Sequence, residues 1–108
     1  MNRLIYFPAF FIIGLTACAG HSYRVKENNL YIYLKEPNAQ AVYFLHSLDG
    51  YTAHEAKKID EHTWEIIVPA NTEFKYFYLV DGALHIPACE FRENDDFGSQ
   101  NCIYVPEA

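Results

Sequence analysis

Basic side chains are scarce in this chain. It carries 8 lysines and arginines against 14 aspartates and glutamates, and its formal net charge is −6. The sequence also has no basic stripe interleaved with aromatic residues. An acidic domain repels the phosphate backbone of nucleic acids. Nucleic acid is therefore not expected as a partner, whereas a neutral ligand is compatible with this charge.

Long hydrophobic runs are also missing. The apolar stretch Leu4 to Leu15 follows the short segment Met1-Asn2-Arg3 and, at about a dozen residues, is too short to span a bilayer comfortably. It ends in Leu15-Thr16-Ala17-Cys18, which resembles a bacterial lipobox. The resemblance implies a lipoprotein signal peptide at 1–17, cleaved by signal peptidase II, and lipidation of Cys18. The alternative is an ordinary signal peptide or an N-terminal anchor helix, with Cys18 incidental.

A lipid on Cys18 would hold the protein at a membrane without crossing it. Each buried methylene contributes about 0.8 kcal/mol, so three acyl chains make attachment effectively permanent. Ala19, not aspartate, follows the cysteine. By the sorting rule of enteric bacteria, this implies the cell envelope, at the outer membrane and facing the periplasm. Ala19 to Asn29 is polar without a hydrophobic period, so residues 18–29 are expected to be the lipidated cysteine and a tether of roughly 18 Å.

The chain has three cysteines, and two of them lie after Cys18. Cys89 and Cys102 are expected to form a disulfide in an exported protein; two free buried thiols are the alternative. No Cys-x-x-Cys motif or nearby histidine at ligand spacing accompanies either one. The five histidines share no metal spacing along the chain, so no metal ligands and no cofactor are assigned; they are His21, His46, His54, His62 and His85.

Recognisable catalytic motifs are absent as well. The sequence has no Gly-x-Ser-x-Gly or similar nucleophile signature. Glycoside hydrolysis needs two carboxylates at a defined separation across a cleft, and a sandwich of about 80 residues rarely holds one. Solvated loop charges explain the candidate carboxylates, and the protein is not expected to be an enzyme; these residues are Glu55, Asp60, Glu61, Glu90, Asp95 and Asp96.

The strongest structural signal is the segment Glu73 to Gly82. It is aromatic and β-branched, and it closes on Asp81-Gly82, which is typical of a strand entering a tight turn. Both of its faces are largely apolar, so it is expected at the centre of a sheet. One face carries Phe74, Tyr76, Tyr78 and Val80, and the other carries Lys75, Phe77, Leu79 and Asp81.

Further strands are expected on both sides of this segment. Residues 52–59 are ambiguous between helix and strand, and 88–101 is interpreted as an irregular acidic loop. The pattern predicts an all-β sandwich of about seven strands over 30–106. The other clear strands are expected at 30–35, 40–46, 63–68 and 102–105, with a short one at 83–86.

The order of these pieces resembles one family. Trp64 lies in a short strand, followed by a Pro/Asn turn, by Phe-x-Tyr-x-Tyr-x-Val-Asp-Gly, and by Phe97-Gly98-x-x-Asn101 before a last apolar strand. This is similar to the early-set immunoglobulin-like carbohydrate-binding module of isoamylases and branching enzymes, which is also the glycogen-binding domain of the AMP-activated kinase β subunit. The resemblance covers roughly 29–106. It implies a short strand in 52–59 that carries an apolar residue such as Ile59 into the core.

The resemblance also implies where a sugar would bind. The family stacks sugars on tryptophans, and here Tyr51 and Leu84 stand at those positions. The family's lysine aligns with Phe77, although Lys75 lies two positions earlier, on the same face. Asn101 matches a sugar-contacting position directly. Trp64 is expected in the core. The candidate site is therefore Tyr51, Lys75, Leu84 and Asn101.

Two functions follow from these residues. The first is non-catalytic binding of an α-glucan or another envelope polysaccharide. The second is a protein-interaction or structural module of the envelope that has lost the sugar site. Exposed aromatic residues on one sheet would suit a protein partner, and burial under the second sheet is the alternative for them; they are Tyr31, Tyr33, Tyr43 and Phe77. The first function requires Tyr51 and Asn101 on one face, beside Lys75 or Phe77.

Overall fold

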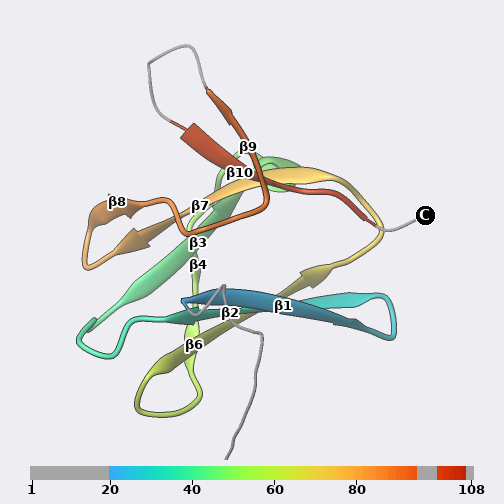
Figure 1. Ribbon diagram of the computed structural model, residues 1–108. Coiled ribbons are helices and arrows are strands. Elements are labelled where there is room, and N and C mark those ends of the chain that lie inside the picture. The colour runs from blue at the N-terminus through green and yellow to red at the C-terminus, as the bar shows by residue number, and fades with distance from the viewer. Residues whose placement is uncertain (1–19, 95–99, 107–108) are drawn as a thin grey trace, which may run out of the picture.

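The protein is a two-layer β-sandwich (Figure 1). The computed structural model describes residues 20–94 and 100–106, so the expected signal peptide, Cys18 and the Phe97-Gly98-Ser99 segment lie outside the described residues. Ten strands and one short 3₁₀ helix, η2 (Ser47–Asp49), are present in the described part. The strands are β1 (His21–Lys26), β2 (Asn29–Lys35), β3 (Val42–His46), β4 (His54–Glu55), β5 (Lys57–Lys58), β6 (Thr63–Pro69), β7 (Phe74–Val80), β8 (Ala83–His85), β9 (Phe91–Asn94) and β10 (Gln100–Tyr104).

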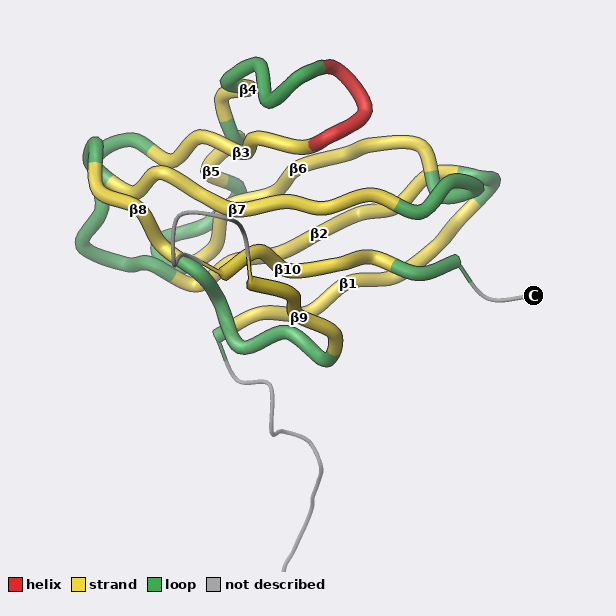
Figure 2. The backbone as a smooth tube through the Cα atoms, turned by 90° about the horizontal axis from the view of Figure 1, so that it is seen from above, coloured by secondary structure: helices red, strands yellow, loops and turns green. Residues whose placement is uncertain are grey.

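The strands form two antiparallel sheets. The four-stranded sheet has the order β1-β2-β6-β5, and the six-stranded sheet has the order β4-β3-β7-β10-β9, with β8 paired to β7. Figure 2, viewed from above, shows η2 and β4 beyond β3 at one edge of the sandwich. The predicted all-β sandwich is confirmed. Within the described ranges, no helix has the length and hydrophobicity needed to cross a bilayer.

β7 lies at the centre of its sheet, between β3 and β10, as predicted. Phe74, Tyr76 and Tyr78 point inward and are buried, whereas Lys75 and Phe77 point outward. The strand ends in a tight turn because Asp81 and Gly82 both adopt the left-handed backbone region, with φ of 50° and 84°.

The core fills the space between the sheets with large apolar side chains. Trp64 belongs to it, as predicted; it is 7 % exposed, and its indole Nε1 donates a hydrogen bond of 3.1 Å to the carbonyl oxygen of Glu36. Burial of each large apolar side chain contributes about 1.5–3 kcal/mol. Every residue of the core lies between positions 30 and 104; the largest fully buried side chains are Tyr78, Phe44, Phe74, Leu30, Ile32 and Leu34.

The prediction that residues 18–29 form a tether is wrong for the part of this segment that forms a strand. Residues 21–26 of that segment form β1, which pairs along its whole length with β2, from His21 opposite Leu34 to Lys26 opposite Asn29. The hairpin turn uses Glu27 and Asn28 in the left-handed region. β1 showed no hydrophobic period because it is an edge strand whose residues after His21 are all exposed.

Two further expectations are corrected. The interpretation of 88–101 as an irregular loop is wrong at β9, which pairs with β10. Sequence pattern does not indicate this edge strand, because it is mostly polar and exposed. The placement of Ile59 in the core is also wrong. The chain passes from one sheet to the other between β4 and β5, and Ala56 at this crossing is 4 % exposed, whereas Ile59 is 43 % exposed.

The predicted disulfide is confirmed. Cys89 and Cys102 are joined, with their Cα atoms 5.9 Å apart. Cys102 is fully buried on β10, and Cys89 packs against the edge of the core. The bridge therefore fastens the segment before β9 to the hydrophobic core.

Candidate functional site

The predicted sugar-binding residues lie on the outer face of the six-stranded sheet, the face turned away from the core. Alternation along β7 directs Lys75, Phe77 and Leu79 outward. Leu84 on β8 stands opposite Leu79 in the strand register and is 52 % exposed. Cys102 is paired with Tyr76 in antiparallel strands, so the preceding residue, Asn101, lies beside Phe77. Lys75, Leu84 and Asn101 therefore share this face.

The loop after β3 brings Tyr51 to the same face. Gly50 and Tyr51 adopt the left-handed region, and the Tyr51 backbone N–H donates to the carbonyl oxygen of His46 at 2.9 Å. This turn folds the loop back toward the sheet. The ring of Tyr51 then lies beside that of Phe77, with 5.8 Å between centroids and 24° between planes. Tyr51 remains 36 % exposed.

Polar groups flank the two rings. Lys75 Nζ lies 2.8 Å from Glu93 Oε1 on β9. The hydrogen bond and the charge of Glu93 raise the pKa of Lys75. Glu93 is paired with half-buried Asn101 in the β9–β10 register. An ammonium, a carboxylate and an amide thus stand next to the Tyr51–Phe77 rings.

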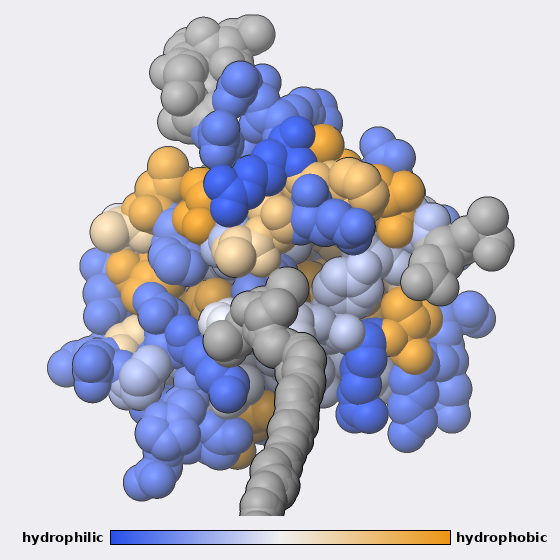
Figure 3. Space-filling view, in the orientation of Figure 1, coloured by the Kyte–Doolittle hydropathy of each residue, from blue (hydrophilic) through white to orange (hydrophobic). Residues whose placement is uncertain are grey.

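On the face of the molecule that Figure 3 shows, hydrophobic residues are interspersed with hydrophilic ones. The condition for an aromatic patch on one sheet is not met, because the four candidate residues lie on two different sheets. Tyr43 lies on the outer face of the six-stranded sheet, opposite Leu79. Tyr31 and Tyr33 are half-buried on the outer face of the other sheet. There the Arg24 guanidinium carbon lies 5.3 Å from the Tyr31 ring centroid.

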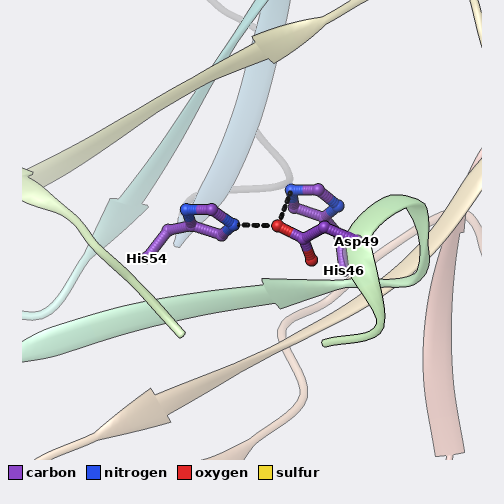
Figure 4. A group of neighbouring side chains, drawn as sticks. All are labelled: His46, Asp49 and His54. Atoms are coloured by element: carbon purple, nitrogen blue, oxygen red, sulfur yellow. Dashed lines mark hydrogen bonds and ion pairs between the residues drawn. The ribbon is translucent and has the colours of Figure 1, made fainter. Parts of the chain in front are cut away.

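A second group of side chains comes together only in the fold and has no motif in the sequence. His46, Asp49 and His54 each offer one ligand atom, and these atoms lie within 4.8 Å of one another. Figure 4 shows a nitrogen of each imidazole directed at the same carboxylate oxygen. His54 Nε2 bonds to Asp49 Oδ2, and His46 Nε2 lies 3.8 Å from that oxygen. The two rings are parallel, with centroids 5.0 Å apart.

The environment sets the protonation of this cluster. The pKa of His46 is lowered, mainly because the imidazole is buried. The Asp49 carboxylate acts in the opposite direction, and His54 adds to the lowering. The hydrogen bond from His54 is the main cause of a lowered pKa of Asp49. His46 Nδ1 is buried and has no hydrogen-bond partner among the described residues.

The chain offers only a faint signal for this cluster. His46 and Asp49 are three residues apart and meet because η2 makes a single tight turn between them. His54 joins them because β4 folds back on β3, where His54 stands opposite Phe44. The histidines share no ligand spacing along the chain, but His46 and His54 converge in the fold.

The fold and these surfaces define a small antiparallel sandwich with an aromatic and polar outer face and a His-Asp-His cluster at one edge. No model of a known protein family matches the chain, and no curated protein is significantly similar to it. The resemblance to the early-set carbohydrate-binding module stays a prediction from sequence.

Proposed function

We propose that the protein is a membrane-anchored, non-catalytic binding lipoprotein that binds a neutral polysaccharide on the outer face of its six-stranded sheet. An α-glucan is the first candidate ligand, and the anchor is a lipid on Cys18 at the periplasmic side of the outer membrane. The observation that carries the proposal is the placement of Tyr51 beside Phe77, with Asn101 on the same face.

The chemistry of this face suits a sugar chain. A pyranose presents apolar C–H groups on its flat faces and hydroxyl groups around its rim. The nearly parallel rings of Tyr51 and Phe77 offer an apolar surface for a flat face. Lys75, Glu93 and Asn101 offer donors and acceptors for rim hydroxyls. A neutral polymer is not repelled by a chain with a net charge of −6.

The apolar surface continues beyond the two rings. Leu79 lies between Tyr43 on β3 and Leu84 on β8 in the strand register. This row extends the contact surface along the sheet for a further sugar unit. The exposed Leu84 also supports the second candidate, a protein-interaction module, because a branched aliphatic side chain packs against protein as well as against sugar.

The test is retention of residues 19–108, which include the whole hydrophobic core, on insoluble starch, immobilised glycogen and peptidoglycan. Tyr51→Ala is compared with Tyr31→Ala, a matched change on the opposite sheet. We expect retention on an α-glucan that is lost in Tyr51→Ala and kept in Tyr31→Ala. Absence of retention on all three polymers would reject the sugar site and favour the protein-interaction module.

A further inference from the structure

We propose that His46, Asp49 and His54 form a binding site for a divalent transition-metal cation of the Zn²⁺ type. The site lies at the edge of the sandwich formed by the end of β3, η2 and β4, and the loop between Asp49 and His54 also carries Tyr51. The inference is independent of the polysaccharide proposal, because it rests on different side chains.

The donor atoms are close to the spacing that a metal needs. Zn²⁺ binds nitrogen and oxygen at about 2.0–2.2 Å in a tetrahedral arrangement, which holds its ligand atoms roughly 3.3 Å apart. The three donors already lie within 4.8 Å of one another. His54 makes most of the adjustment, because its side chain is 42 % exposed and its strand is two residues long. The parallel rings must tilt so that both lone pairs point at the ion.

His46 supplies the fixed side of the site. It is 6 % exposed, its Nδ1 has no hydrogen-bond partner in the described part of the chain, and its Nε2 lies 3.8 Å from Asp49 Oδ2. The nitrogen that would bind a cation is Nε2, which faces Asp49, whereas the unpartnered Nδ1 is the other ring nitrogen. Burial restricts the movement of this ring, so His46 is the least adjustable of the three ligands.

The ligand types select the metal. Two imidazoles and one carboxylate suit Zn²⁺ and its transition-metal neighbours, whereas Mg²⁺ and Ca²⁺ prefer oxygen ligands throughout. Metal binding requires neutral imidazole and ionised carboxylate, which are the ordinary forms of these side chains slightly above neutral pH. The cluster opens into a cleft that Glu55 and Glu65 also line, which leaves access for the ion and for a water ligand.

A bound ion would join three consecutive pieces of the chain. His46 ends β3, Asp49 ends η2, and His54 begins β4. The loop between Ser47 and Ala53 would then be closed by a metal bridge at its base. We expect the ion to stabilise this part of the fold.

The experiment titrates Zn²⁺ into metal-free, full-length protein in mild detergent, in competition with a chromogenic chelator. We expect one equivalent to bind, and we expect His54→Gln and Asp49→Asn each to weaken binding at least about tenfold. His62→Gln, a change at an exposed histidine outside the cluster, should leave the affinity unchanged. His46 is left intact because it is buried.

Two further readouts separate metal ligation from a structural role. Co²⁺ should produce the intense visible absorption of a low-coordinate site, and His54→Gln should abolish it. Zn²⁺ should raise the Tm of the wild type but not that of His54→Gln. A large excess of Mg²⁺ should not displace the bound Zn²⁺. Absence of stoichiometric Zn²⁺ binding would overturn the proposal, as would equal binding by the wild type and all three variants.

Discussion

His21 and Tyr78, which are 57 positions apart in the chain, are joined by a buried hydrogen bond of 3.1 Å between Nε2 and the phenol hydroxyl. The bond ties the first residue of β1 to the central strand of the opposite sheet. The rings of His21 and Tyr78 also meet edge to face, with 5.7 Å between centroids. Residues 21–26, which form β1, are thus part of the sandwich.

The burial of His21 predicts a loss of stability in mild acid. Burial, with a smaller effect of His85, lowers the pKa of His21 from 6.5 to about 4. The unfolded chain therefore binds a proton in this window that the folded chain does not, so the free energy of unfolding falls as pH drops from 6.5 toward 4. At pH 5 we expect a loss of about 2 kcal/mol relative to pH 7.5.

Urea unfolding of residues 19–108 at the two pH values measures this loss. His21→Gln keeps a hydrogen-bonding partner for Tyr78 but does not titrate, so its difference between the two pH values should be smaller by that amount. His46, which has a lowered pKa as well, remains in both proteins and cancels in the comparison. Equal pH dependence in the two proteins would contradict the assignment to His21.

The disulfide is expected to contribute a large part of the stability. Cys89 and Cys102 are 13 positions apart, and closing a loop of that size stabilises by about 3 kcal/mol in the chain-entropy model. Reductant should therefore lower the urea midpoint of the wild type. The double variant with alanine at both positions should unfold at the lower midpoint with or without reductant. A reductant effect of equal size in the double variant would show that it does not act through this bridge.

The side chain of Asp81 connects the β7–β8 turn to the segment before β3. Its Oδ1 accepts hydrogen bonds from the backbone N–H groups of Gln40 at 2.8 Å and Ala41 at 2.9 Å. We expect Asp81→Ala to destabilise the domain by about 1–2 kcal/mol, because both donors lose their partner. Asp81→Asn retains an acceptor oxygen and tolerates the left-handed backbone, so its urea midpoint should lie much nearer the wild type. Equal losses in both variants would argue against the hydrogen bonds.

Leu84 offers a gain-of-binding test of the polysaccharide proposal. It lies opposite Leu79, faces outward and is 52 % exposed. The larger indole ring of tryptophan therefore fits at this position without repacking the core. An added aromatic contact is worth about 0.5–1.5 kcal/mol, and Leu84→Trp should strengthen α-glucan binding roughly 2- to 12-fold. Affinity electrophoresis in glycogen measures the change, with Ile67→Trp on the opposite sheet as control. Unchanged binding in Leu84→Trp would remove this residue from the sugar surface.

Patterns that report burial were read correctly from the sequence. The central position of β7 and the core position of Trp64 are both confirmed. β1 and β9 were missed because edge strands gain their hydrogen bonds from a neighbour and need no apolar face of their own. Sequence pattern does not indicate the burial of Ala56, which lies where the chain crosses from one sheet to the other between β4 and β5, whereas Ile59 follows this crossing and is exposed.

The class of fold, the central strand and the disulfide could be predicted from the sequence, because hydrophobic alternation and an isolated pair of cysteines are local signals with a direct physical meaning. Which surface residues come into contact depends on the three-dimensional arrangement of the strands and loops. Tyr51 reaches Phe77 through a left-handed turn, and His54 reaches His46 and Asp49 because a two-residue strand folds back on β3. These side-chain contacts depend on strand register and on the direction of the loops, which the periodicity of the sequence does not encode.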